Sequence, residues 1–295
     1  MKVLVTGVKG QLGHDVVNEL INRNHEAIGV DIEEMDITDL ASVNEVVRNV
    51  NPDAVIHCAA WTAVDAAEDD DKKDKVHLVN AVGTSNIAKV CKEINCKLMY
   101  ISTDYIFDGQ GTNPWQPDCK DYKPLNVYGE TKLAGELAVS KTLDRYFIVR
   151  IAWVFGKNGN NFIKTMLKVG KTRDKLTVVN DQIGTPTYTF DLARLLVDMI
   201  ETDKYGYYHA TNEGGYISWY DFTKEIFRQA VELGHTEYSE ERLTVTPVTT
   251  AEYGLSKAKR PFNSRLDKSK LVENGFQPLP TWQDAIHRYM QDIEF

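Results

Sequence analysis

The feature that most constrains this chain is a run of glycines that interrupts its first apolar segment. A β-branched strand, Val3–Thr6, stops at Gly7-Val-Lys-Gly10-Gln-Leu-Gly13, and apolar residues then recur at helical spacing. Strand, glycine turn and helix in this order are typical of a dinucleotide-binding unit, whose glycines let the backbone approach a pyrophosphate. The spacing is G-x-x-G-x-x-G rather than G-x-G-x-x-G, so the position between strand and helix carries the inference. The residues expected to hold the pyrophosphate are Gly7, Gly10, Gln11, Leu12 and Gly13.

An acidic residue ends the next predicted strand, Glu26–Asp31. It lies about twenty residues beyond the glycine turn, where such folds place a carboxylate on the adenosine ribose. Asp31 would repel a 2′-phosphate, so it favours NADH, although Lys9 in the turn partly offsets this and NADPH stays open. The alternative is that Asp31 only ends the strand and does not contact the cofactor. Asp36 and Ile37 precede a helix expected over residues 38–49 and are placed to border the adenine.

Predicted strands and helices alternate through the first half of the chain. Further strands are expected over residues 53–58, 97–102 and 146–151, with a helical pattern from 75 to 95. This alternation predicts an α/β fold with a doubly wound, parallel Rossmann-type sheet and ligands at the carboxyl ends of its strands. After residue 151 the alternation becomes irregular. We therefore expect an NAD(P)-binding domain over residues 1–150 and a smaller, mainly substrate-binding α/β domain over residues 151–295, with some segments returning to the first.

Composition narrows the class of protein. A chain of 295 residues that is 42% hydrophobic can bury a sizeable core without disulfides, and its four cysteines lack the spacing of metal ligands. We expect reduced thiols and no metal. A net charge of −9 argues against nucleic acid or an anionic membrane as the main partner. With no leader and no membrane-spanning run, the sequence predicts a cytoplasmic protein; it leaves the oligomeric state open, a homodimer included.

The chemistry is expected in the stretch Pro124-Leu-Asn-Val-Tyr-Gly-Glu-Thr-Lys132. Proline is excluded from helix interiors and Asn126 is a good N-cap, so a helix should begin near Asn126. Tyr128 and Lys132 would then share one face. Lowering a phenol's pKa from about 10 by roughly three units takes about 4 kcal/mol, which a nearby ammonium in a desolvated site could supply. Taken alone, the same spacing also fits an ordinary exposed pair.

Six motifs occur in a fixed order, mostly at predicted strand ends: Thr6-Gly7-x-x-Gly10-x-x-Gly13, Asp31, Cys58-Ala59-Ala60, Asn80, Ser102-Thr103-Asp104 and Tyr128-x-x-x-Lys132. This order resembles that of the extended short-chain dehydrogenase/reductases. Within that superfamily the chain is similar, nearly end to end, to the dTDP-4-dehydrorhamnose reductase family. The segments that carry this similarity are 59–68, 102–109, 124–136, 153–155, 159–162, 180–186 and 260–267.

The resemblance implies that the chain reduces the 4-keto group of dTDP-4-dehydro-L-rhamnose to dTDP-L-rhamnose with NAD(P)H. Tyr128 would be the proton donor, and Lys132 would lower its pKa and hold the nicotinamide ribose. Thr103 would hydrogen-bond the substrate carbonyl, where charge develops. Related dehydratases carry Thr-Asp-Glu where this chain has Thr103-Asp104-Tyr105, so dehydration is not expected. The cofactor-binding residues that complete this set are Ala59, Ala60, Thr62, Asn80, Tyr128 and Lys132.

Several residues are expected to contact the nucleotide sugar. Trp153 could pack on the sugar or belong to the core, and Asn161 could contact the diphosphate or cap the following helix. Arg260 or Arg265 could pair bidentately with the diphosphate, although salt bridges to surface acids would explain them almost as well. The other substrate-binding residues expected from the resemblance are Val64, Asp65, Thr103, Asp104 and Tyr105.

Two other functions stay open from the sequence. A reductase or epimerase for a different nucleotide sugar would use the same Thr103, Tyr128 and Lys132. A non-catalytic, reductase-like regulatory subunit would have the same fold. Such a subunit would typically have lost Tyr128, Lys132 or the glycine turn. All three are present.

Overall fold

A six-stranded parallel sheet forms the centre of the computed structural model, which describes residues 1–295. Its strand order is β10-β5-β4-β3-β1-β2. From β1 the chain first adds β2 on one side, and from β3 onward it adds strands on the other side. This is the doubly wound α/β sheet that the sequence predicts. The strands are β1 (Lys2–Thr6), β2 (Glu26–Val30), β3 (Ala54–His57), β4 (Lys97–Thr103), β5 (Tyr146–Ile151) and β10 (Gly206–His209).

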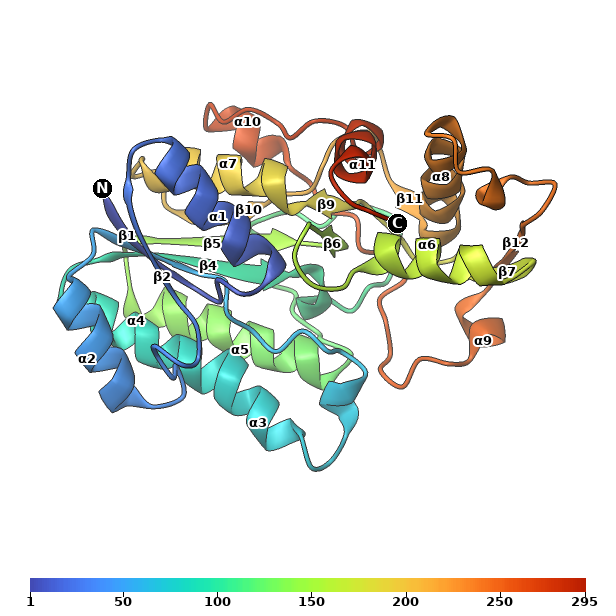
Figure 1. The fold of residues 1–295 in the computed structure, drawn as a ribbon. Coiled ribbons are helices and arrows are strands. Elements are labelled where there is room, and N and C mark those ends of the chain that lie inside the picture. The colour runs from blue at the N-terminus through green and yellow to red at the C-terminus, as the bar shows by residue number, and fades with distance from the viewer.

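Helices cover both faces of this sheet (Figure 1). One face carries α1 (Gln11–Asn22) and α7 (Thr189–Ile200), and the other carries α2 (Leu40–Val50), α4 (Thr84–Glu93) and α5 (Val127–Thr142). Successive strand residues point to opposite faces, so Val3 and Val5 join one core cluster while Leu4 joins the other. Burial on both faces explains why the strands read as continuous apolar runs.

The helical pattern expected from 75 to 95 is an irregular helix of three pieces. A short α3 (Lys73–His77) passes into a π-helical segment, Leu78–Gly83, and then into α4. Segments of π-helix are rare and occur frequently at functional sites. This one carries Asn80, whose contacts are described below.

The second half of the chain forms three small sheets beside the carboxyl ends of the central strands (Figure 1). They pair β6 with β9, β7 with β12 and β8 with β11, and they pack with their helices around a separate apolar cluster. The elements are β6 (Val154–Phe155), α6 (Phe162–Thr172), β7 (Lys175–Val179), β8 (Ile183–Gly184), β9 (Thr187–Tyr188), β11 (Ile217–Ser218), α8 (Trp219–Glu232), β12 (Thr244–Val248), α9 (Thr250–Tyr253), α10 (Ser269–Glu273) and α11 (Trp282–Gln291).

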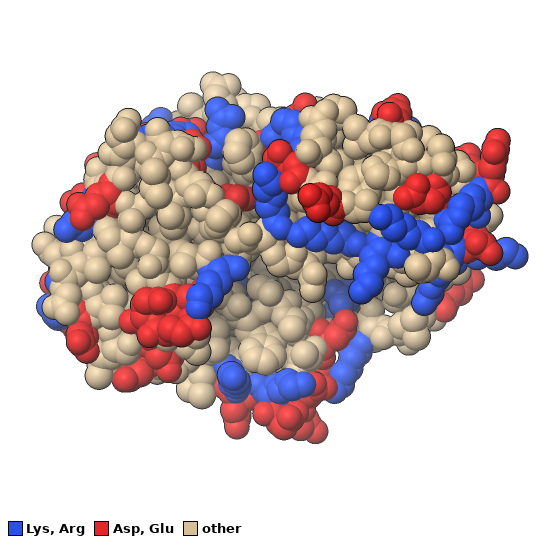
Figure 2. Space-filling model, viewed as in Figure 1, with Lys and Arg blue, Asp and Glu red and all other residues tan.

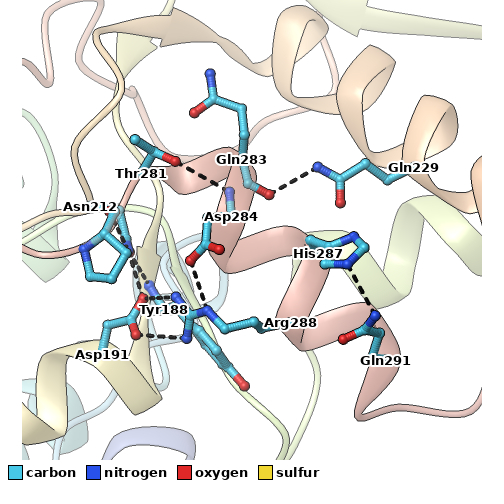
Figure 3. Close-up of polar contacts among 11 residues, drawn as sticks. Tyr188, Asp191, Asn212, Gln229, Thr281, Gln283, Asp284, His287, Arg288 and Gln291 are labelled. Atoms are coloured by element: carbon cyan, nitrogen blue, oxygen red, sulfur yellow. Dashed lines mark hydrogen bonds and ion pairs between the residues drawn. The ribbon is translucent and has the colours of Figure 1, made fainter.

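A partly buried ion pair ties the last helix to the central layer. Arg288 on α11 donates two hydrogen bonds of 2.8 Å to the carboxylate of Asp191 in the first turn of α7 (Figure 3). The Asn212 side chain donates to the same carboxylate at 2.8 Å. Through α7 and β10, segments beyond residue 151 thus take part in the central layer. No helix of the structure is both long and apolar enough to cross a membrane.

Candidate active site

A cavity of about 960 Å³ opens at the carboxyl ends of the central strands, between the sheet and the small sheets. Figure 2 shows this face hollowed near its centre. Most residues singled out from the sequence line the cavity: Gly7, Gly10, Gln11, Leu12, Gly13, Asp31, Asp36, Ile37, Ala59, Ala60, Thr62, Val64, Thr103, Asp104, Tyr105, Tyr128, Lys132, Trp153 and Arg260. Four others, Asp65, Asn80, Asn161 and Arg265, are not part of its lining.

The glycine turn leaves the N-terminus of α1 open to the cavity. Gly7 has a positive φ of 71°, and a Cβ there would lie 2.8 Å from the backbone of Ala59. A Cβ at Gly13 would lie 2.3 Å from the carbonyl oxygen of Gly7. Gly10 is the N-cap of α1 and provides no side-chain cap, so the first N–H groups of the helix stay available to an anion.

Asp31, which follows β2, is hydrogen-bonded to the backbone of the glycine turn. One carboxylate oxygen of Asp31 accepts the backbone N–H of Lys9 at 3.1 Å, and the other accepts that of Ile32 at 2.9 Å. The Lys9 ammonium lies 2.6 Å from the carboxylate of Glu33. Lys9, the cation of the glycine turn, is therefore paired with Glu33. This pairing leaves Lys9 less able to offset the repulsion between Asp31 and a 2′-phosphate.

A buried chain of hydrogen bonds supports the loop that follows β3. The hydroxyl of Thr84 donates to the carbonyl of Asn80 at 2.8 Å, so it accepts from Nε2 of His57 at 3.1 Å. Nδ1 of His57 then accepts from the Thr6 hydroxyl at 2.7 Å, and that hydroxyl accepts the N–H of Ala59 at 3.1 Å. Burial lowers the pKa of His57 to about 3, so this histidine is neutral. His57 is not among the residues identified from the sequence.

Asn80 fixes the same loop from behind the cavity wall. Its side-chain carbonyl accepts the N–H of Trp61 at 2.8 Å, and its amide donates to the Thr131 hydroxyl at 3.1 Å. Because Thr131 precedes Lys132 on α5, Asn80 joins the loop after β3 to the helix that carries the proposed catalytic pair. In the structure it holds wall residues in place and does not itself face the cavity.

Helix α5 begins as predicted, with the Asn126 side chain accepting the N–H of Gly129 at 2.8 Å. Tyr128 lies in the first turn; burial raises the pKa of its phenol, and the neighbouring Thr103 side chain opposes this shift. The Lys132 ammonium donates one of its three N–H groups to the carbonyl of Ile101 at 2.7 Å. Burial lowers the pKa of Lys132 to about 7.

An aromatic wall closes the other side of the cavity. Trp153 has a φ of 51°, a left-handed conformation that is strained for a bulky side chain and is typical of functional positions. Its ring stacks on that of Trp219 with centroids 3.7 Å apart, and both rings line the cavity with Phe162 and Phe222. Trp153 thus belongs to the wall and to an aromatic cluster at once. Trp219 was not identified from the sequence.

Asn161 caps a helix. Its side-chain carbonyl accepts the N–H of Lys164 at 3.0 Å, and its amide donates to the carbonyl of Gly156 and the hydroxyl of Tyr289, both at 2.9 Å. The helix cap is therefore the alternative that the structure favours, and the expected diphosphate contact has no free donor at this side chain.

Arg260 lines the cavity but is already paired. Its guanidinium donates to the Tyr105 hydroxyl at 3.0 Å and to the carboxylate of Asp65 at 2.7 Å. Asp65 also accepts the N–H of Ala258 at 3.0 Å, which fastens the segment before Arg260 over the loop after β3. Arg265 donates to the Asn263 side chain at 3.1 Å and is not part of the lining.

The chain is similar to known proteins over nearly its whole length. The family model described as "RmlD substrate binding domain" matches residues 1–295. The chain is 38% identical over 291 residues to the spore coat polysaccharide biosynthesis protein SpsK of Bacillus subtilis, covering 99% of this chain and 97% of that protein. It is 39% identical over 293 residues to the dTDP-4-dehydrorhamnose reductase of Aggregatibacter actinomycetemcomitans, covering 97% of each.

A solved structure extends the comparison to three dimensions. The dTDP-4-dehydrorhamnose reductase of Bacillus anthracis, in complex with NADP, superposes with a TM-score of 0.90 at 39% identity, covering 99% of this chain and 100% of that one. Fold and sequence relatives therefore agree over the full length, and they confirm the resemblance drawn from the motifs. The chain belongs to the dTDP-4-dehydrorhamnose reductase family of NAD(P)H-dependent oxidoreductases.

Proposed function

We propose that this protein reduces the 4-keto group of dTDP-4-dehydro-L-rhamnose to dTDP-L-rhamnose. One observation carries the proposal: a single cavity brings the glycine turn together with Thr103, Tyr128 and Lys132 at the strand ends. Hydride transfer from a nicotinamide dinucleotide to a keto sugar needs both parts side by side. The glycine turn would bind the pyrophosphate of the cofactor, and the polar residues would supply the proton for the sugar. The full-length match to the reductase family supports the same substrate.

The residues present fit a nicotinamide dinucleotide. Side chains at Gly7 and Gly13 would collide with backbone, so the turn can keep its close approach only with glycine. The uncapped N-terminus of α1 offers N–H groups and a positive dipole end to a pyrophosphate. When bound, the reduced cofactor supplies the hydride for the carbonyl carbon.

Each polar residue then has a defined task. Tyr128, which burial keeps protonated, donates its phenolic proton to the carbonyl oxygen as that oxygen gains charge. Thr103 hydrogen-bonds the same oxygen. Lys132 binds the nicotinamide ribose and stabilises the phenolate that Tyr128 becomes. Arg260 and Asp65 hold Tyr105 and the loop after β3 against the sugar side of the cavity.

We propose that NADH is the preferred cofactor. The support is the Asp31 carboxylate at the end of β2, together with the pairing of Lys9 with Glu33, which leaves the turn without a free cation for a 2′-phosphate. The relative from Bacillus anthracis was solved with NADP, so both cofactors belong in the assay. Replacing Asp31 by Asn should raise the ratio of kcat/KM for NADPH to that for NADH by about tenfold or more, which corresponds to about 1.4 kcal/mol.

The proposed function is tested by following the oxidation of NADH and NADPH with enzymatically prepared dTDP-4-dehydro-L-rhamnose and identifying the sugar product. Formation of dTDP-L-rhamnose is expected. The matched variant is Tyr128→Phe, which should bind cofactor like the wild type and lose activity by about a hundredfold or more. A folded protein that binds cofactor and oxidises none of it with this substrate would refute the proposal. Turnover of Tyr128→Phe within a few-fold of wild type would refute the assignment of the proton donor.

We propose a division of labour along the chain that follows the sequence prediction. Residues 1–150, with α7 and β10 completing the layer, would hold the cofactor, and the remaining small sheets and helices would hold the nucleotide sugar. The aromatic wall of Trp153 and Trp219 on the sugar side supports this division. Trp153→Ala should raise KM for the sugar nucleotide and leave the Kd for cofactor unchanged.

Cytoplasmic action is part of the same proposal, supported by four free cysteines and by the use of a nicotinamide cofactor. Cell fractionation with an antibody to the protein would test it. The homodimer left open by the sequence is tested by analytical ultracentrifugation of the purified chain.

A further inference from the structure

The hydroxyl of Thr103 has a competing acceptor at its side. Its Oγ1 lies 2.9 Å from Oδ1 of Asp104 and accepts the backbone N–H of Tyr105 at 3.2 Å. A hydroxyl has one proton to donate, and an ionised carboxylate can only accept. While Asp104 is charged, Thr103 must therefore point its proton at Asp104. It then has no proton left for the substrate carbonyl, which is the task that the proposed function gives it.

Few groups around Asp104 would stabilise a negative charge on its own carboxylate. The residue is 1% exposed, and its Oδ2 is buried without a hydrogen-bond partner. Such a carboxylate costs free energy unless it is paired. Burial raises the pKa of Asp104 to about 6, against the opposing effects of the Ser264 and Thr103 side chains and of nearby backbone N–H groups.

No cation faces this carboxyl group. From α5, Tyr128 is a neutral phenol, and the Lys132 ammonium is directed to the carbonyl of Ile101. Tyr105, on the turn after β4, is also neutral, since burial raises its pKa to about 12. Arg260 reaches the Tyr105 hydroxyl and the carboxylate of Asp65 instead of Asp104.

We propose that Asp104 acts as a neutral carboxylic acid that donates its proton to Oγ1 of Thr103 and so turns the Thr103 hydroxyl toward the substrate carbonyl. The two lone pairs of Oγ1 are then filled by the Asp104 O–H and the Tyr105 N–H, and the remaining direction for its own proton is into the cavity. Asp104 keeps its proton throughout the cycle, and Tyr128 supplies the proton that is added to the oxygen. Asp104 is thus a positioning residue that acts through Thr103. This role rests on the proposed function.

The test compares pH profiles of kcat/KM for the wild type and Asp104→Asn. In the wild type, kcat/KM should fall by about tenfold per pH unit above the pKa of Asp104. An asparagine amide donates to Thr103 at every pH and cannot titrate. Asp104→Asn should therefore lose the part of the decline that begins at the pKa of Asp104, and its kcat/KM should exceed that of the wild type at higher pH.

A second variant separates this role from direct substrate binding. In Thr103→Val the group that Asp104 orients is absent, so activity should be low and the decline assigned to Asp104 should be gone. If Asp104 instead accepts a hydrogen bond from a sugar hydroxyl, the decline should persist in Thr103→Val. Either a persisting decline, or Asp104→Asn being inactive at every pH while it binds cofactor and melts like the wild type, would overturn the inference. No wild-type turnover at any pH would instead overturn the proposed function.

Discussion

Glu136 and Arg150 form an ion pair with no solvent access, between the helix of the proposed catalytic pair and the central sheet. Both side chains are 0% exposed, and the guanidinium donates two hydrogen bonds of 2.9 Å to the carboxylate. Glu136 is on α5, one turn beyond Lys132, and Arg150 is on β5. Removing one partner of a buried pair leaves the other charge uncompensated, at a cost of about 3–5 kcal/mol.

Glu136→Gln is the perturbation that isolates the charge, because glutamine has the same shape and retains one acceptor. We expect the free energy of unfolding to fall by about 3 kcal/mol, near the lower end of that range, since one N–H of Arg150 keeps its partner. Urea denaturation measures the change, and an unaltered slope would show that the unfolding reaction is the same.

Glu232→Gln is the matched control. It removes a carboxylate from Arg228 on the exposed side of α8, where the Glu232 side chain is 59% exposed. Exposed pairs of this kind contribute about 0–1 kcal/mol. If Glu136→Gln costs no more than the control, the buried pair does not stabilise the α5–β5 contact in the way that its geometry indicates.

Three further predictions concern the glycine turn and the histidine behind it. Gly13→Ala should weaken cofactor binding by about tenfold or more in a fluorescence titration, because its Cβ would lie 2.3 Å from the Gly7 carbonyl oxygen. His57→Gln can keep both hydrogen bonds, whereas His57→Leu leaves the Thr6 donor unpaired and should lower the free energy of unfolding by about 1–3 kcal/mol. Because the pKa of His57 is about 3 when folded, below its value of about 6.5 when unfolded, the unfolded state binds the extra proton. Below pH 6.5 the wild type should therefore lose stability relative to His57→Gln, by about 1.4 kcal/mol per pH unit down to about pH 3; equal acid sensitivity would contradict a neutral buried His57.

Local patterns predicted the parts of the fold and site that depend on local chemistry. The glycine turn follows from steric needs within seven residues, and the start of α5 follows from a proline and, two residues later, an N-capping asparagine. Strand positions follow from apolar runs buried on both faces. Most residues expected from the motif order line one cavity, because the carboxyl ends of parallel strands meet at one edge of the sheet.

Contacts between distant segments account for what the sequence did not show. The partners of His57 come from positions 6 and 84, and no pattern near position 57 announces either. Asn80 stands in a π-helical segment, which over six residues has no apolar periodicity that separates it from an α-helix. Arg260 reaches Asp65 across 195 positions, so its pairing could only be considered as one of two alternatives.

The titratable groups around the cavity share one bias, toward the neutral form. Burial keeps the Tyr128 phenol protonated and the His57 imidazole uncharged, raises the pKa of Asp104 to about 6 and lowers the pKa of Lys132 to about 7. The Tyr128 phenol therefore carries its proton before the reaction, and the buried phenolate that proton transfer would leave is unfavourable until a cation compensates it. Under the proposed function the balance changes when Tyr128 has donated its proton. The phenolate raises the proton affinity of Lys132, and the ammonium stabilises the phenolate in return, since each opposite charge favours the other in a desolvated site. The phenol and the lysine thus become an ion pair after the reaction, and the return of a proton from solvent restores the phenol for the next cycle.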